Sequence, residues 1–145
     1  MINKITVIGV GLIGGSLARA LKEKNLAKDV FGYGRDQARL EDAQKLNIID
    51  RFSTSIEEAI VGAEIIVIAT PVGTFQSILE EIEPLITENV IITDVGSTKT
   101  DIVNIVHNVL RAKSNCFIPA HPIAGKKEAA LKRVIQCFLM ARKSS

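Results

Sequence analysis

Three glycines at a fixed spacing constrain this chain more than any other feature of its sequence. They are Gly9, Gly11 and Gly14, in the pattern G-x-G-x-x-G, at the end of an apolar run over residues 5–10 and just before a segment of helical period over residues 16–24. Glycine lowers local chain order, so three of them are useful mainly where the backbone turns tightly or approaches something closely. The spacing therefore predicts a strand, a tight turn and a helix that packs against the strand.

Short apolar runs alternate with longer segments of helical period along the rest of the chain. The expected strands are residues 5–10, 29–33, 51–53, 65–69, 90–93 and 117–120, and the expected helices are residues 16–24, 36–46, 56–61, 75–82 and 101–110. Strands that alternate with helices are joined by right-handed crossovers into a parallel sheet. We therefore predict a single α/β domain with a Rossmann-like, doubly wound and mainly parallel sheet.

The composition excludes several classes of protein. In 145 residues, 47% are hydrophobic and 23% are charged, which suits a globular core and does not suit a disordered chain. The uncharged stretch at residues 5–18 is shorter than the roughly 20 apolar residues that cross a bilayer, and glycines interrupt it as they would not interrupt a signal peptide. Two cysteines, Cys116 and Cys137, fit free thiols in a reducing compartment. We expect a cytoplasmic domain without a membrane partner.

The residues that follow the strands indicate a dinucleotide site, because parallel sheets bind ligands beyond the carboxyl ends of their strands. In a strand–turn–helix context, Gly9 allows the turn, Gly11 lets the backbone approach a pyrophosphate, and Gly14 allows close packing of the helix. Two residues after the predicted strand at 65–69 would border the same cofactor. The expected cofactor residues in these segments are Gly9, Gly11, Leu12, Ile13, Gly14, Thr70 and Pro71.

The end of the second predicted strand bears on the choice between NAD and NADP. An NAD site usually has an aspartate or glutamate there, whereas this chain has Gly34 followed by Arg35. Arginine binds phosphate in a bidentate manner, so Arg35 favours the 2′-phosphate of NADP. NAD stays the alternative, because Asp36 could turn to the ribose and Arg35 could be an ordinary solvated side chain.

One histidine and one short loop are candidates for chemistry. His121 ends the last predicted strand at the ligand edge, and an imidazole with its ordinary pKa near about 6.5 accepts protons at neutral pH. Ser97 and Lys99 follow the strand at 90–93, where Ser97 could cap a helix or hold a substrate oxygen, and Lys99 could attract an anion or be solvated. His107 lies in a predicted helix and is interpreted as a solvated or packing residue. No metal site is predicted.

Four motifs, VIGVGLIGGSLA, ATPV, TDVGSTKTD and HPIAG, give residues 1–125 a resemblance to the prephenate and arogenate dehydrogenases of tyrosine biosynthesis. The resemblance implies that prephenate or arogenate is the substrate. A hydride passes from the ring carbon to NAD(P) while carbon dioxide departs, and prephenate becomes 4-hydroxyphenylpyruvate. It also implies that His121 takes the proton of the ring hydroxyl and that Ser97 helps to hold it. Ser97, Lys99 and His121 form the expected substrate site.

The resemblance ends after residue 125, where the charge of the chain also changes. Residues 1–125 carry 12 basic and 15 acidic side chains, whereas residues 126–145 carry six and one. We therefore expect a nucleotide-binding domain at 1–125 and a basic, helix-like tail at 126–145. The helical domain through which the full-length family forms homodimers is expected to be absent, and this chain is expected to be weak or inactive by itself.

Two other functions stay open from the sequence. The chain could be a non-catalytic NAD(P)-binding module, or a domain of another β-hydroxyacid-type dehydrogenase with the same nucleotide fold. Neither alternative, nor the dehydrogenase interpretation, involves nucleic acid as a partner, since the basic surplus is confined to a short tail.

Overall fold

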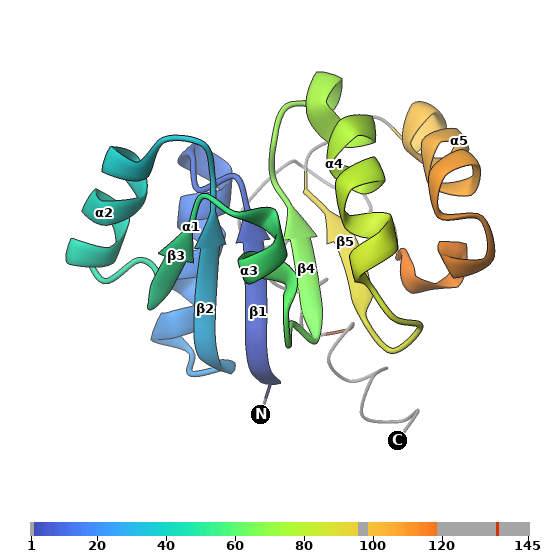
Figure 1. Ribbon diagram of the computed structural model, residues 1–145. Coiled ribbons are helices and arrows are strands. Elements are labelled where there is room, and N and C mark those ends of the chain that lie inside the picture. Colours follow the sequence, from blue (N-terminus) through green and yellow to red (C-terminus); the bar gives the residue numbers. More distant parts are fainter. Residues whose placement is uncertain (1, 96–98, 119–135, 137–145) are drawn as a thin grey trace.

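The computed structural model describes residues 2–95, 99–118 and 136 of the chain. Five parallel strands form one sheet in the order β3-β2-β1-β4-β5 (Figure 1). The strands are β1 (Ile2–Ile8), β2 (Ala27–Tyr33), β3 (Arg51–Ser53), β4 (Ile65–Ile68) and β5 (Ile91–Asp94). The helices are α1 (Leu12–Glu23), α2 (Gln37–Lys45), α3 (Ile56–Ile60), α4 (Phe75–Ile82) and α5 (Lys99–Leu110), with short 3-10 turns at Val72–Thr74, Glu83–Leu85 and Arg111–Cys116. The predicted doubly wound, Rossmann-like α/β fold is confirmed.

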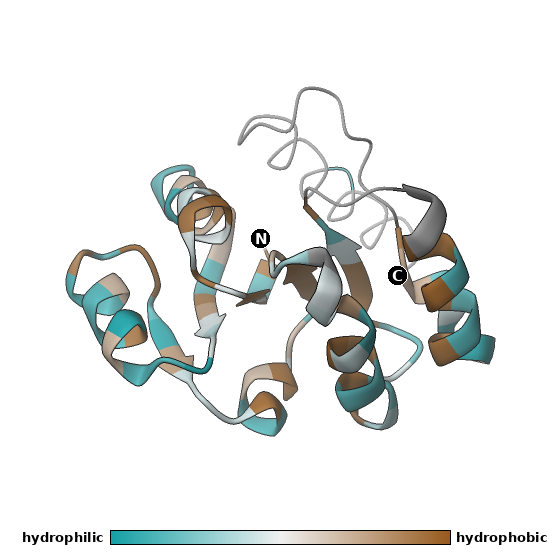
Figure 2. Ribbon diagram, turned by 90° about the horizontal axis from the view of Figure 1, so that it is seen from above, coloured by the Kyte–Doolittle hydropathy of each residue, from teal (hydrophilic) through white to brown (hydrophobic). Residues whose placement is uncertain are grey.

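Helices cover both faces of the sheet (Figures 1 and 2), and the side chains of its strands are shared between two cores. Ile5 and Val7 of β1 pack in one core with α1 and α2, whereas Ile8 packs in a second core with α3, α4 and α5. All four residues of β4 are buried, two in each core. A parallel strand covered on both faces requires an uninterrupted apolar run, which the residues of Ile65–Ile68 supply.

The first strand and helix differ from their predicted bounds. β1 spans Ile2–Ile8 rather than residues 5–10, because Gly9 adopts a φ of +93° and leaves the extended conformation. The helix that follows begins at Leu12, four residues before the predicted start at residue 16. The last glycine of the motif is therefore a helical residue, and the turn between strand and helix is shorter than the pattern of apolar residues indicates.

The last predicted strand, residues 117–120, is described only in part. Phe117 forms a single parallel bridge with Ile92, and the N–H of Ile118 donates to the Ile92 carbonyl oxygen at 2.8 Å. Residues 119 and 120 lie outside the described part of the chain. The bridge places this segment next to β5, on the side away from β4.

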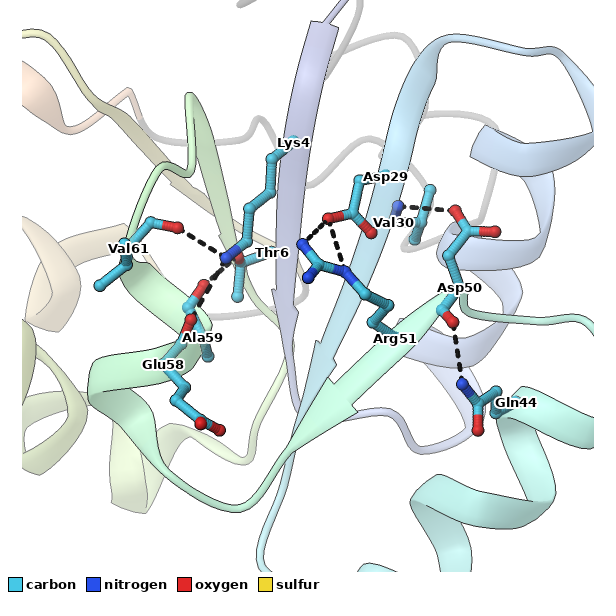
Figure 3. A network of polar contacts seen from close by, with 10 residues as sticks. All are labelled: Lys4, Thr6, Asp29, Val30, Gln44, Asp50, Arg51, Glu58, Ala59 and Val61. Atoms are coloured by element: carbon cyan, nitrogen blue, oxygen red, sulfur yellow. Dashed lines mark hydrogen bonds and ion pairs between the residues drawn. The ribbon is translucent and has the colours of Figure 1, made fainter.

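Two polar side chains of β1, Lys4 and Thr6, hold α3 against the sheet (Figure 3). The acceptors are backbone carbonyl oxygens of α3 and its C-cap: Val61 and Glu58 for the Lys4 Nζ, at 2.6 and 3.2 Å, and Ala59 for the Thr6 Oγ1, at 2.5 Å. A helix leaves its last four carbonyl groups without partners inside the helix. Because α3 spans only Ile56–Ile60, these bonds from the sheet give partners to most of the carbonyl groups that the short helix leaves unpaired.

The ammonium group of Lys4 lies in an unusual environment for a lysine. Lys4 is only 8% exposed, and its Nζ lies 4.3 Å from the centre of the Phe31 ring. Arg51, which is paired with Asp29, lies over the same ring at 5.3 Å. Burial lowers the pKa of Lys4, and the positive charge of Arg51 lowers this pKa further. The two carbonyl oxygens and the ring are what offset the cost of burying this cation.

Replacing Lys4 with methionine is expected to lower the free energy of unfolding by about 2 kcal/mol. Methionine keeps an unbranched apolar stem of similar size, but it has no donor for the two carbonyl oxygens at the end of α3. Urea denaturation measures the loss, and Lys28→Met is the matched control because Lys28 is an exposed residue of β2. Equal losses in the two variants would show that Lys4 does not support α3.

The difference in unfolding free energy between the wild type and Lys4→Met is also expected to depend on pH. Since the pKa of Lys4 is lower in the folded chain than its ordinary value of 10.5, the unfolded chain binds more protons between those two values. The stability of the wild type relative to Lys4→Met is therefore expected to rise with pH through that window, and to level off above it.

Candidate functional site

A cleft of about 630 Å³ opens at the carboxyl edge of the sheet, lined by the segments that follow β1, β2, β4 and β5. After β1 the chain passes to α1 on one face of the sheet, and after β4 it passes to α4 on the other face. Because β1 and β4 are neighbours, the two connections leave adjacent strands for opposite faces of the sheet. Figure 2 shows this edge of the sheet from above. Open α/β sheets bind ligands at such a switch point.

Most of the predicted cofactor residues come together in this cleft. Those that line it are Gly9, Gly11, Leu12, Ile13, Arg35, Thr70 and Pro71, while Gly14 lies beneath the loop. The lining also contains seven residues that are not among the predicted cofactor residues, namely Val10, Gly34, Asp36, Arg39, Leu40, Ala69 and Val95. Of these, Arg39 and Leu40 lie in no motif of the sequence. A capping signal could have found two of them. Arg39 and Leu40 stand three and four residues after the capping Asp36, which places them in the first turn of α2.

The glycine loop is packed so closely that two of its positions have no space for a side chain. A Cβ atom at Gly14 would lie 2.0 Å from the carbonyl oxygen of Gly9, and one at Gly9 would lie 2.8 Å from the Cγ2 of Thr70. At Gly11 a Cβ would meet no heavy atom within 4 Å, because this position faces the open cleft. Gly9 and Gly14 are therefore required by packing, and Gly11 leaves space for a ligand.

The first turn of α1 is suited to an anion. Its N-cap is Gly11, which has no side chain to accept from the first N–H groups, and the first turn contains no acidic residue. These N–H groups and the helix dipole favour a negative group such as a pyrophosphate. Leu12 is 90% exposed and Ile13 is 46% exposed at the same place, so an apolar rim borders the anion site.

The loop after β4 contributes Thr70 to the lining of the cleft. The N–H of Ala69 donates to the carbonyl oxygen of Ile8 at 2.8 Å, which fixes the start of the loop beside the glycines. The Oγ1 of Thr70 is buried and has no hydrogen-bond partner among the described residues. Buried polar atoms in native proteins nearly always have a partner, so this hydroxyl has the capacity to bind a ligand oxygen.

Cationic side chains form the wall of the cleft beyond β2. Arg35 is exposed, and Asp36 is the N-cap of α2, with its Oδ1 accepting from the backbone N–H of Arg39 at 3.3 Å. The carboxylate of Asp36 is thus engaged with its own helix. The cap uses only Oδ1, so the other oxygen keeps its capacity to accept and the alternative in which Asp36 binds a ribose stays open.

The segment predicted to contain the catalytic groups begins at the cleft. Asp94 ends β5 and is only 3% exposed, and Val95 lines the cleft. Lys99 is the first residue of α5. Ser97 and His121 lie outside the described residues, so their catalytic and substrate-binding roles stay predictions.

Other observations limit the chemistry of the described chain. Within residues 2–95, 99–118 and 136, no group of three or more metal-ligating side chains is close enough to hold a metal ion. None of the helices in these ranges is long and apolar enough to span a membrane. Cys116 is free and buried, and Cys137 lies outside the described residues. His107 is exposed on α5, in agreement with its interpretation as a solvated residue.

The fold and the cleft define a nucleotide-binding α/β domain of the Rossmann type. A family model described as "Prephenate dehydrogenase, nucleotide-binding domain" matches residues 17–137, and the chain belongs to this family. The match continues beyond residue 125, and the division of the chain at that residue stays a prediction.

Similar proteins with curated functions are dehydrogenases. The chain is 35% identical over 132 residues to the prephenate dehydrogenase of Bacillus subtilis. The aligned region covers 90% of this chain and 35% of that protein. It is 31% identical over 121 residues to the cyclohexadienyl dehydrogenase of Zymomonas mobilis. This aligned region covers 83% of this chain and 41% of that protein. The chain thus spans between about a third and two fifths of the length of these relatives.

Two solved structures of prephenate and arogenate dehydrogenases have the same fold as this chain. Prephenate dehydrogenase from Aquifex aeolicus, in complex with hydroxyphenyl propionate and NAD+, superposes with a TM-score of 0.75 at 29% identity, over 87% of this chain and 43% of that chain. Arogenate dehydrogenase from Synechocystis superposes with a TM-score of 0.73 at 32% identity, over 85% of this chain and 42% of that chain.

Proposed function

We propose that this chain binds NAD(P) in the cleft and takes part in the oxidative decarboxylation of prephenate or arogenate. The observation that carries the proposal is the cleft at the switch point, where a glycine cradle, an uncapped helix N-terminus and an unpartnered buried hydroxyl meet. These groups fit a dinucleotide. Gly11 and the first turn of α1 would hold the pyrophosphate, and Thr70 would bind an oxygen of the ribose or phosphate.

The proposed reaction is based on the activities named for the similar proteins. Prephenate, arogenate and cyclohexadienyl dehydrogenases are all similar to this chain, and the Aquifex aeolicus enzyme holds NAD+ together with a hydroxyphenyl compound. A bound nicotinamide would accept the hydride from the ring carbon that bears the hydroxyl group. We assign this chemistry to the cleft because its anion site and its exposed apolar rim suit a dinucleotide and a ring-shaped substrate beside it.

The proposed roles of the protein groups follow from the electron flow. His121 takes the proton of the ring hydroxyl as the hydride leaves the same carbon. The bond to the departing carboxylate supplies its electron pair to the ring, which becomes aromatic, and the proton can return to the phenol oxygen. Ser97 orients His121, and Lys99 attracts a substrate carboxylate. The cytoplasm is the proposed location, and by the family resemblance the longer proteins of this family are homodimers.

An assay of the 145-residue chain tests the proposal. Nucleotide binding is measured by calorimetry. Turnover is measured by the formation of the reduced nicotinamide and of the aromatic product, which is 4-hydroxyphenylpyruvate from prephenate and tyrosine from arogenate. We expect NAD(P) binding and slow turnover. Binding without turnover at high protein concentration would favour a non-catalytic nucleotide-binding module, and absence of binding would exclude both functions.

A further inference from the structure

The wall of the cleft beyond β2 contains two arginines whose guanidinium groups are only weakly engaged. Arg35 forms no ion pair and no side-chain hydrogen bond among the described residues. The side chain of Arg39 is 78% exposed, and its Nε lies 3.9 Å from the Oδ2 of Asp36, at the limit of an ion pair. Both arginines line the cleft, one before α2 and one in its first turn. Their donors are therefore available to a ligand.

The electrostatic balance at this place favours an anion. Among the residues that the structure describes, Asp36 is the one acidic side chain that lines this wall, and it already caps α2. The first turn of α2 contains no acidic residue, so two guanidinium groups and the positive end of a nine-residue helix face a single carboxylate. A phosphate monoester, with a charge of about −1.5 to −2 at neutral pH, is the group that such an arrangement binds well.

Gly34 shows that the missing carboxylate is not a consequence of packing. A Cβ atom at Gly34 would meet the side-chain carbons of Leu40 at 3.6 to 3.8 Å, which are ordinary contacts, and Gly34 does not have a positive φ. This differs from Gly9 and Gly14, where a Cβ would collide with the backbone or a neighbouring side chain. An aspartate or glutamate would fit at the position where NAD sites usually have one, and the open space is left to the ligand.

We propose that Arg35 and Arg39 together bind the 2′-phosphate of NADP, so that this cleft selects NADP over NAD. The inference rests on the nucleotide binding proposed above, and it adds Arg39 to the residues that determine cofactor preference. Arg35 reaches the phosphate from the loop and Arg39 reaches it from the helix. Two forks from different elements fix the position of a phosphate better than one exposed arginine.

The test compares binding of NADP and NAD, and of the fragments 2′,5′-ADP and 5′-AMP, to the 145-residue chain by calorimetry. We expect NADP and 2′,5′-ADP to bind more tightly than their counterparts without the 2′-phosphate. Arg35→Ala and Arg39→Ala are each expected to weaken NADP binding about tenfold or more and to leave NAD binding nearly unchanged. Added salt should reduce the affinity for NADP more than that for NAD.

Control variants distinguish a loss of the charge that binds the 2′-phosphate from general damage to the fold. Arg19→Ala removes an exposed arginine of α1 that is paired with Glu23 and does not line the cleft, and it should leave both affinities unchanged. Gly34→Asp should reverse the preference, while Gly34→Asn, which has the same shape without the charge, should not. Equal affinity for NADP and NAD, or an equal loss of both in Arg39→Ala, would overturn the inference and leave the nucleotide site intact. If neither nucleotide binds, the proposed function fails as well.

Discussion

Replacing Gly14 with alanine is expected to destabilise the domain by about 3 kcal/mol and to abolish nucleotide binding. The added methyl carbon would lie 2.0 Å from the carbonyl oxygen of Gly9, a separation that no pair of non-bonded atoms tolerates. The backbone fixes the position of a Cβ, and its partner in this contact is a backbone oxygen, so no side-chain rotation relieves the collision. Helix α1 would have to move off β1, which would open the core around Leu17 and Leu21 and displace the N–H groups at the cleft.

The adjacent residue provides a matched control. Gly15 lies in the same turn of α1, but a Cβ there would meet only the Cγ1 of Val10, at 4.0 Å. Gly15→Ala is therefore expected to raise the free energy of unfolding by about 0.5 to 1 kcal/mol, because alanine is a better helix former than glycine. Urea denaturation compares the two variants. Similar stability in both would show that the helix and strand are not in close contact.

Gly11→Ala separates the ligand from the fold within the same motif. A Cβ at Gly11 meets no heavy atom within 4 Å, so the denaturation curve should be nearly that of the wild type. The methyl group would nevertheless occupy the space into which a pyrophosphate approaches the backbone. We expect NADP binding to weaken about tenfold or more in a variant that folds normally. Unchanged binding would mean that the phosphates lie elsewhere.

Much of the fold could be predicted from the sequence because local and tertiary signals agree. The β-branched run at residues 65–69 predicts a strand buried on both faces, and β4 spans Ile65–Ile68 with all its residues buried. The glycine spacing predicts a tight turn and close packing of helix on strand. The structure has this packing, since a Cβ added at Gly9 or at Gly14 would collide with neighbouring atoms. The sequence signals for these features lie in residues that are close in sequence, although the collision at Gly9 is with Thr70 of the loop after β4.

Other features depend on contacts between residues that are distant in sequence. Nothing near Lys4 indicates that its ammonium group caps a helix 54 residues away, and a lysine in a strand is ordinarily interpreted as exposed. The capping signal at Asp36 places Arg39 in the first turn of α2, but it does not show that α2 packs beside the end of β2 and so brings Arg39 to the cleft. Periodicity cannot supply such placements, because it describes which face of an element is apolar and not what that face meets.

Replacing His121 with alanine is expected to lower the turnover proposed above by about 10²- to 10⁴-fold while NADP binding stays unchanged. The resemblance assigns to this residue the proton of the ring hydroxyl, and hydride departure from that carbon requires the oxygen to lose its proton as the C–H bond breaks. A histidine that acts as the base also sets the pH dependence of the rate. The rate of the wild type should rise with pH as the imidazole loses its proton and should then level off, because only the neutral imidazole accepts a proton.

His107 provides the control for this variant, since the sequence contains just two histidines. His107 is exposed on α5 and lines no part of the cleft, so His107→Ala should retain both turnover and its pH profile. Nucleotide affinity, measured on each variant, distinguishes a lost base from a damaged fold. If His121→Ala retained the rate and the profile of the wild type, the proton would have to leave through another group, and the assignment of His121 would be wrong even with the nucleotide site intact.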